Sequence, residues 1–412
     1  MTGRPVRHDS GAASPTMAMR PRNLSGNWQY PENGVNLQLI MSETKSAKRN
    51  TVISICKGIA IILMVVGHAE APGLITNFIY TFHMPLFFMA AGYFFSRKYL
   101  DTPWTFISRR LKTLYLPFLK WSIFFLLMHN IWFHLGILNE EYGNWTGGVT
   151  HPYSPADAVQ RLVMMVFGMS GYDEFMAGAF WFFRGLLLAS VGFLLLYKIL
   201  DARTRLNPTM CVVAICLLMV GFTALHIHYG FRISVIPNGG WRETWGIFFF
   251  GAGVLFHTYE SRLRQHWAIT LFFVAFLCFA AVQHFSGMNN SGRMADLITL
   301  PLTGTVGFLA VHHLSTVIDR HDTRLRRWLV FIGDNTLYIF ILHIMAFKPV
   351  SMLKIWYYDL DPAQIGCHMV IHYNNTDFFW VVYSIAGVAL PVGALLLWRA
   401  LRTHFSRKAV AA

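Results

Sequence analysis

The sequence predicts an all-α membrane protein with about ten transmembrane helices around a central cavity. Only 13% of the 412 residues are charged, about half the share of a soluble domain, and 55% are hydrophobic. The hydrophobic residues gather in long runs that match the length of a membrane-spanning helix. The basic residues lie mainly in short connections between these runs, as they do in the cytoplasmic loops of membrane proteins.

Ten apolar runs have roughly the length that a bilayer requires, and the sixth is the shortest. If the N-terminus is cytoplasmic, 27 of the 34 Lys and Arg residues fall on the cytoplasmic side, and 7 fall outside or within later spans. Removing one span would invert this pattern downstream, so we expect both termini to be cytoplasmic. The predicted spans are 52–70, 75–96, 113–135, 178–199, 209–228, 243–258, 267–285, 295–318, 328–347 and 377–399.

The two ends of the chain differ from the apolar middle. Residues 1–50 are polar and basic, and no apolar core of the signal-peptide kind precedes the first span. We therefore expect a disordered cytoplasmic tail over residues 1–50. The membrane domain is expected over residues 51–400, followed by a cytoplasmic C-terminal tail over 401–412.

Charge and cysteine patterns argue against several other kinds of protein. The net charge of +14 belongs to the loops, and no basic stripe interleaved with aromatic residues indicates nucleic-acid binding. The five cysteines show neither metal-ligand nor redox spacing. We find no phosphate-binding loop or dinucleotide fingerprint, so the sequence predicts no metal site and no permanently bound cofactor.

Ionisable side chains within apolar runs are the first candidates for function, because charge is expensive to bury in a bilayer. Lys57 and His68 lie in the first run, separated by ten residues and roughly 16 Å apart along a helix. A cation at the mouth and an imidazole farther in would fit a coenzyme A thioester, which carries phosphates at one end and its acyl group at the other. Taken alone, Lys57 also fits an interfacial lysine, and His68 fits a histidine hydrogen-bonded between helices.

The order of motifs in residues 57–95 resembles the acyltransferase 3 family of integral-membrane acyltransferases, in particular its fucose 4-O-acetylase-like branch. In that family a basic residue, ten others and then a histidine occupy the first span, as Lys57 and His68 do here. The segment FHMPLFFMAAGYFF (82–95) resembles the motif of the second span. Many family members have arginine where this chain has Lys57, which keeps the charge but loses the bidentate fork. The resemblance implies that His68 is the catalytic residue.

The same resemblance extends to a basic segment, SRRLKTLYLPF (108–118). It implies that Arg109, Arg110 and Lys112 lie at the cytoplasmic mouth and bind the phosphates of the donor. The alternative is ordinary positive-inside charge without ligand contact. His83 would line the site near a kink at Pro85, and a purely structural histidine is the alternative.

Later motifs imply residues on the acceptor side. Trp181 and Arg184, in FWFFRGLLLA, begin a span at the outer face, where a sugar could stack and form hydrogen bonds. His343, which ends FIGDNTLYIFILH, would also line the acceptor side. Glu243 and the adjacent Arg242 precede the sixth span, and they either orient the acceptor or pair with each other.

These features predict a membrane O-acyltransferase of the bacterial inner membrane. It would move an acetyl group from acetyl-CoA to a hydroxyl of a cell-surface glycan or lipid-linked sugar, with His68 as base. Direct attack by the hydroxyl and an acyl-histidine intermediate both fit. A transporter or flippase is the first alternative, although the spans carry few carboxylates for a proton relay. A haem-binding electron carrier using His68, His83 and His343 is the second, although no paired spacing on one helix supports it.

Overall fold

Helices build the whole part of the chain that the computed structural model describes, which comprises residues 50–142, 150–234, 236–263, 266–290, 292–374 and 376–411. No β-strand occurs in these ranges. Eight segments are long and apolar enough to cross a membrane, which confirms the predicted polytopic all-α architecture. The expected tail falls almost wholly on residues 1–49, outside the described residues. The long helices are α2 (Thr51–His68), α3 (Gly73–Tyr80), α4 (His83–Tyr93), α5 (Pro103–Arg110), α6 (Leu116–His134), α7 (Pro155–Gly168), α9 (Trp181–Arg203), α10 (Pro208–Tyr229), α11 (Trp241–Tyr259), α12 (Trp267–Val282), α13 (Asp296–Asp319), α14 (Arg324–Asp334), α15 (Thr336–Tyr358) and α16 (Phe379–Ala411).

Each of the ten predicted spans contains helix, but two of them are not among the eight segments that meet the length and hydropathy of a span. These are α11, with 19 residues, and α12, with 16. The last helix, α16, continues as far as Ala411, so the residues assigned to a C-terminal tail extend the last helix.

The second span is broken three to four residues before the position that the sequence indicated. We expected a kink at Pro85, but the break lies at Thr81 and Phe82, and α4 begins at His83. Pro85 therefore occupies the first turn of α4, where its missing N–H would have no helical partner in any case. Thr303 donates a hydrogen bond to the Thr81 carbonyl (3.2 Å), which satisfies a backbone group at the break.

The ninth predicted span, 328–347, contains the end of one helix and the beginning of the next. Helix α14 ends at Asp334 and α15 starts at Thr336, because Asn335 leaves the helical conformation and its side chain binds the Phe331 carbonyl (2.7 Å). Helix α14 is strongly amphipathic and packs along α2, whereas α15 supplies the span and continues to Tyr358. The end of α14 and the start of α15 form one apolar run in the sequence, so the predicted span wrongly crosses the boundary between the two helices.

Two further segments differ from the prediction, which gave a simple third span followed by a loop. A π-helical turn (Leu111–Tyr115) connects α5 and α6 into one long element. The predicted outer loop 136–177 contains α7, which starts with a capping box formed by Ser154 and Asp157. One side of α7 is apolar and open, with Phe167 86% exposed, as in a helix that lies at a membrane interface.

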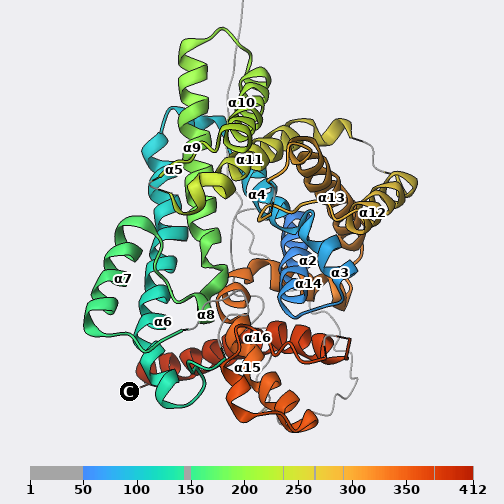
Figure 1. Cartoon of the computed structure of the whole chain (residues 1–412). Coiled ribbons are helices and arrows are strands. Elements are labelled where there is room, and N and C mark those ends of the chain that lie inside the picture. Colours follow the sequence, from blue (N-terminus) through green and yellow to red (C-terminus); the bar gives the residue numbers. More distant parts are fainter. Residues whose placement is uncertain are drawn as a thin grey trace, which may run out of the picture.

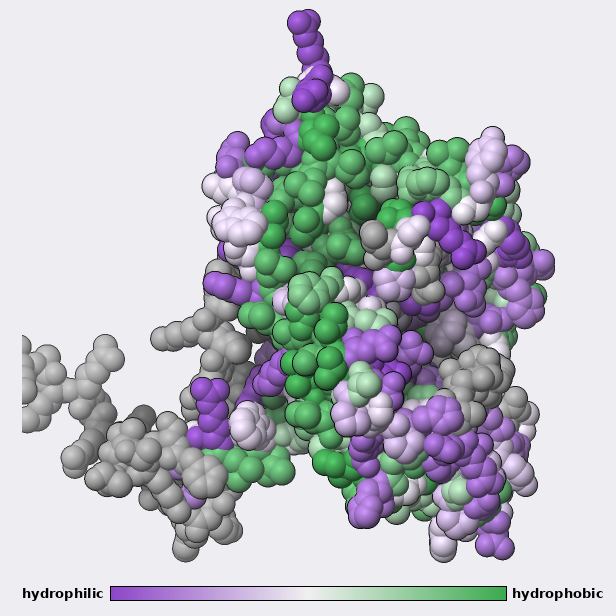
Figure 2. Space-filling view, turned by 60° about the vertical axis from the view of Figure 1, so that its left-hand side comes forward, coloured by the Kyte–Doolittle hydropathy of each residue, from purple (hydrophilic) through white to green (hydrophobic). Residues whose placement is uncertain are grey.

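Figure 1 shows how these helices surround α2. Helices α9 and α10 form the hairpin at the top, α6 and α7 lie at the left, and α12 and α13 lie at the right. Hydrophobic side chains cover a broad band of the surface in Figure 2, and hydrophilic ones gather at its right and lower edges. Large apolar residues of α6 and α9, such as Leu127 and Leu195, are exposed as lipid-facing residues would be.

Small residues fix α2 tightly against its neighbours. A Cβ on Gly58 would lie 2.4 Å from the Leu329 carbonyl oxygen, and one on Gly333 would lie 1.7 Å from that of Ser54. Only glycine at both positions lets the backbones of α2 and α14 approach this closely, which is how helices pack in a membrane. The start of α2 defines the basic end of the bundle, and His68 defines the histidine end.

Candidate active site

A cavity of about 590 Å³ runs along one face of α2. Lys57, Ile61 and Met64 line it, and their spacing of four and three residues places them on one side of the helix. His68 is the next residue in this series, one turn beyond Met64. The helix thus aligns the cation and the imidazole that the sequence selected, about 16 Å apart along its axis.

Three of the four predicted donor-binding cations meet at the basic end of this cavity. Lys57, Arg109 and Arg110 all line it. The Arg109 Nη1 donates to the Tyr99 hydroxyl (2.8 Å), and the Arg110 guanidinium lies 4.9 Å from the centroid of the Phe106 ring. These aromatic contacts hold the two arginines at the mouth. The fourth, Lys112, is exposed and is not among the residues that line the cavity.

The other end of the cavity is apolar and aromatic. Phe87, Phe182, Phe183 and Phe340 line it together with Met64. His68 itself is not part of the lining, so the cavity stops one helical turn before the imidazole. A hydrophobic chamber of this size accepts the small apolar part of a ligand and excludes water from it.

His68 and His343 form a pair directly beyond this end. The His68 Nδ1 lies 2.9 Å from the His343 Nε2, and the rings stack with their centroids 5.2 Å apart. The His343 Nδ1 lies 2.9 Å from the Phe340 carbonyl oxygen, which only accepts, so this nitrogen carries a proton. In a neutral His343 ring the Nε2 is then an acceptor, and the His68 Nδ1 must donate to it.

These hydrogen bonds determine which ring nitrogen of His68 carries the lone pair. With a proton on Nδ1, the neutral His68 ring has its lone pair on Nε2, and no described residue hydrogen-bonds that atom. His343 is fully buried, whereas His68 is only partly buried. The geometry therefore leaves the free nitrogen of the pair on His68 and makes His343 its support, although we expected His343 to line the acceptor side.

His83 lies behind the pair and is held by its own helix turn. Its Nδ1 donates to the Ile79 carbonyl (2.9 Å), and its ring stacks on Tyr80 with a centroid distance of 5.3 Å. The Tyr80 hydroxyl donates to the Gly67 carbonyl (2.7 Å), beside His68. This arrangement supports the end of α2, and it leaves the His83 Nε2 as a second bare nitrogen.

A comparison with models of known protein families agrees with the motif order, the shared face of α2 and the paired histidines. The sequence model of the acyltransferase 3 domain matches residues 50–405, which is most of the chain. The chain belongs to the acyltransferase 3 family. It is therefore a membrane acyltransferase. No curated protein and no solved structure matched the chain, so the fucose 4-O-acetylase-like branch stays a prediction.

Backbone from residues 359–374 and 376–378 forms a roof over the histidine end of the acyltransferase. Two buried lysines of α15 hold it, since the Lys348 Nζ donates to the Ile365 and Cys367 carbonyls (2.6 and 2.9 Å), and the Lys354 Nζ donates to that of Ile371 (3.0 Å). A salt bridge of 2.6 Å between His372 and Glu70 joins the roof to the turn after α2. The sequence analysis missed these lysines because the ninth span was predicted to end at residue 347, which placed both of them in the following loop.

His368 lies within this roof and faces the ring of Phe175. Burial lowers the pKa of His368 to about 4, and the positive charge of Lys348 adds to this effect. The ring is therefore neutral at physiological pH. Its Nδ1 is buried and has no hydrogen-bond partner among the described residues.

A second buried pair fastens the segment before α9. The His129 Nδ1 lies 2.8 Å from a carboxylate oxygen of Asp173, and its Nε2 lies 2.9 Å from the His151 carbonyl oxygen. Each ring nitrogen of His129 therefore faces an oxygen that can accept a hydrogen bond. Both side chains are almost completely buried, with exposures of 0% and 1%, which suits the pair to anchoring the segment.

The predicted acceptor-side residues are brought together, but in a different arrangement from the one expected. Glu243 pairs with Arg184 (3.0 Å) and not with its neighbour Arg242, and both partners of the ion pair are buried. Arg242 instead lies 4.4 Å above the Trp181 ring, which is itself buried. Trp181 therefore supports an arginine and does not offer an open face to a sugar.

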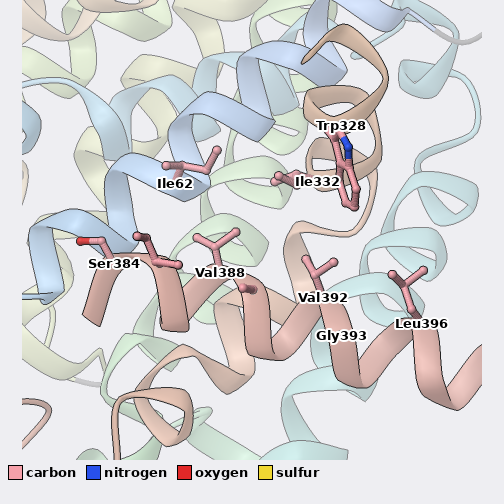
Figure 3. A pocket seen from close by; sticks show the side chains of 10 residues that line it. Ile62, Trp328, Ile332, Ser384, Val388, Val392, Gly393 and Leu396 are labelled. Carbon is pink, nitrogen blue, oxygen red and sulfur yellow. The ribbon is translucent and has the colours of Figure 1, made fainter. Parts of the chain in front are cut away.

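A separate groove of about 540 Å³ lies along α16 and contains none of the predicted residues (Figure 3). Ile62, Ile332, Val388 and Val392 point into it, and Trp328 lies at one side. It has no titratable side chain, so it offers neither a base nor an anchor for phosphate. The groove is suited to apolar chains of the bilayer and not to the transfer reaction.

Proposed function

We propose that the protein is a membrane O-acyltransferase that moves an acetyl group from acetyl-CoA to a hydroxyl of a glycan or lipid-linked sugar. The donor enters at the basic end, and the acceptor reaches His68 from the histidine end. The observation that carries the proposal is the alignment of Lys57, the cavity and His68 along one face of α2.

The basic end is suited to the charged part of the donor. Arg109 and Arg110 offer planar guanidinium groups that match phosphate oxygens, and Lys57 adds a point charge farther inside. The aromatic chamber beyond them is suited to the apolar arm and the acyl group. For the acyl carbon to meet the His68 Nε2, the side chains of Met64 and Phe340 must shift, because they close the cavity one turn earlier.

In direct transfer, the His68 Nε2 takes the proton of the acceptor hydroxyl as its oxygen attacks the thioester carbonyl. The carbon–sulfur bond then breaks, an ester forms, and the proton on His68 passes to the departing thiolate to give coenzyme A. His343 helps by accepting from the His68 Nδ1 throughout, which keeps the lone pair on Nε2 directed outward.

The same nitrogen also supports a two-step route. The His68 Nε2 would attack the thioester, release the thiolate and form an acyl-imidazole, which the hydroxyl would then attack. Incubation with acetyl-CoA in the absence of acceptor separates the routes, since only the two-step route leaves an acetyl group on a peptide that contains His68.

The function is tested by the mass of the product. Cells that express the protein should carry surface glycans heavier by one acetyl group than cells that lack it, and His68→Ala should return the mass to that of the deficient cells. Equal amounts of the two proteins in the membrane fraction provide the control. Glycans of unchanged mass in both, or normal acetylation by His68→Ala, would refute the proposal.

A further inference from the structure

Two arginines at the histidine end differ from the other cations there. Seven of the 34 Lys and Arg residues lie outside the clusters that predict the cytoplasmic face. Five of these seven donate to a carboxylate or a backbone carbonyl. The two others, Arg232 and Arg242, have no hydrogen bond or ion pair with any described residue. The five are Arg161, Arg184, Arg293, Lys348 and Lys354.

Both unpaired arginines line the same cavity, which has a volume of about 540 Å³. It lies between the end of α10, the start of α11 and the segment before α13. Trp241 and His226 form one wall, and Asn289 and Asn290 lie on another. No carboxylate is among the residues that line it; Glu243, which pairs with Arg184, and Glu174 act on Arg242 through their charge but form no hydrogen bond with it.

Arg232 packs against a glycine of its own loop, and Arg242 packs against an aromatic ring. Gly239 has a left-handed conformation (φ +71°), and a Cβ there would lie only 3.0 Å from the Arg232 side chain. The Ile233 N–H donates to the Gly239 carbonyl (3.0 Å), which closes the loop beneath Arg232. Arg242 is fixed by the Trp181 ring, and the neighbouring Arg184–Glu243 ion pair anchors the starts of α9 and α11.

This cavity lies close to the proposed chemistry. Gly287, two residues before Asn289, packs so tightly on Tyr80 that a Cβ would lie 2.4 Å from the Tyr80 carbonyl oxygen. The Tyr80 hydroxyl in turn donates to the carbonyl of Gly67, next to His68. The segment that carries Asn289 and Asn290 is therefore packed, two residues earlier, against the residue that supports the end of α2.

We propose that the cavity lined by Arg232 and Arg242 binds an anionic group of the acceptor, which is the carboxylate of a uronic sugar or the phosphate of a sugar phosphate. This inference rests on the proposed function, because it assigns the acceptor's chemical class. Guanidinium groups bind both anions through paired hydrogen bonds. Asn289 and Asn290 offer amides for sugar hydroxyls, and the Trp241 ring offers an apolar face for the sugar ring.

The test measures binding to the full-length protein in lipid nanodiscs without any acyl donor. The probes are a tetrasaccharide of alternating glucuronate and N-acetylglucosamine, its carboxyl-reduced neutral form, and glucose 1-phosphate. We expect the wild type to bind at least one anionic probe about tenfold more tightly than the neutral one. Arg232→Gln combined with Arg242→Gln should remove this preference, whereas Arg161→Gln, an arginine that also lies on an aromatic ring, should keep it.

Each outcome bears on the proposal separately from the transfer reaction. Preference for the glucuronate probe identifies a uronic acceptor, and preference for glucose 1-phosphate identifies a phosphorylated one. Arg242→Lys, which keeps the charge, should retain part of the preference and shows that the site still folds. Equal binding of anionic and neutral probes, or an unchanged preference in the double variant, would overturn the proposal. His68→Ala should bind as the wild type does, so a failure of the transfer reaction leaves this result readable.

Discussion

The two ends of α2 differ in the surroundings of their ionisable side chains. At the basic end, Lys57, Arg109 and Arg110 line a cavity to which Asp334 also contributes. At the histidine end, His68 and His343 satisfy each other and a backbone carbonyl, and the described residues place no carboxylate in hydrogen-bonding contact with either ring. In the proposed function, this difference separates donor binding from the transfer reaction along a single helix. A cation can hold phosphate where water screens it, whereas a neutral base needs a partner that fixes its tautomer.

The largest expected effect comes from removing the base. His68→Ala should lower the transfer rate by roughly 10²–10⁴-fold, because proton transfer by a positioned side chain contributes about that much. Affinity for acetyl-CoA, measured by calorimetry, should stay within about twofold of the wild type. A variant that lost donor binding and transfer together would show that the two ends do not act separately.

The next effect concerns the support of the base. His343→Phe removes the acceptor for the His68 Nδ1 and should lower kcat roughly 10–100-fold with little change in the KM for acetyl-CoA. His343→Gln, whose amide oxygen can accept the same hydrogen bond, should recover part of kcat. A positioning role predicts this rescue, and equal losses in the two variants would speak against it.

A smaller effect is expected at the basic end. Lys57→Ala or Arg110→Gln should raise the KM for acetyl-CoA about tenfold, which corresponds to roughly 1.4 kcal/mol of binding, and leave kcat nearly unchanged. Lys57→Arg should be milder than Lys57→Ala because the charge remains. Lys112→Ala is the matched control, since Lys112 lies outside the cavity lining. Steady-state kinetics at two salt concentrations provide the measurement, and a fall in kcat alone would contradict phosphate binding.

The smallest effect concerns the stability of the roof. A free histidine titrates near pH 6.5, and burial holds the pKa of His368 at about 4. Between these values the unfolded chain binds more protons, so stability should fall as pH drops from about 6.5 to 4. His368→Gln should remove roughly 1–2 kcal/mol of this dependence, because part of the ring remains accessible. Thermal unfolding in detergent at pH 7 and pH 4.5 tests it, and identical pH dependence in both proteins would refute it.

Much of the fold could be predicted because a bilayer imposes simple rules on length and polarity. The apolar runs located helix in all ten predicted spans, and the Lys57–His68 spacing gave the aligned face of α2. The breaks were missed for a physical reason. Hydropathy does not change where backbone hydrogen bonding is interrupted, as at Phe82 and at Asn335, and the tertiary contacts that satisfy those groups come from distant residues.

The sequence predicted several residues of the candidate site, but it did not predict which of them contact one another. Sequence placed His343 on the acceptor side, but its contact with His68 spans 275 positions and depends on how α15 packs against α2. The sequence offered only the adjacent Arg242 as a partner for Glu243, and the pairing with Arg184 follows from the crossing of α9 and α11. Arg232 gave no sequence signal, because a lone arginine in a loop carries no periodicity.

The most direct test of the central claim is a cryo-electron microscopy map of the protein with a thioether analogue of acetyl-CoA, which cannot transfer its acyl group. The account predicts density for the phosphates beside Lys57, Arg109 and Arg110, with the arm following α2 and the acyl end next to the His68 Nε2, and with Met64 and Phe340 displaced. Density that enters from the histidine end, or an arm that leaves α2 before His68, would contradict it.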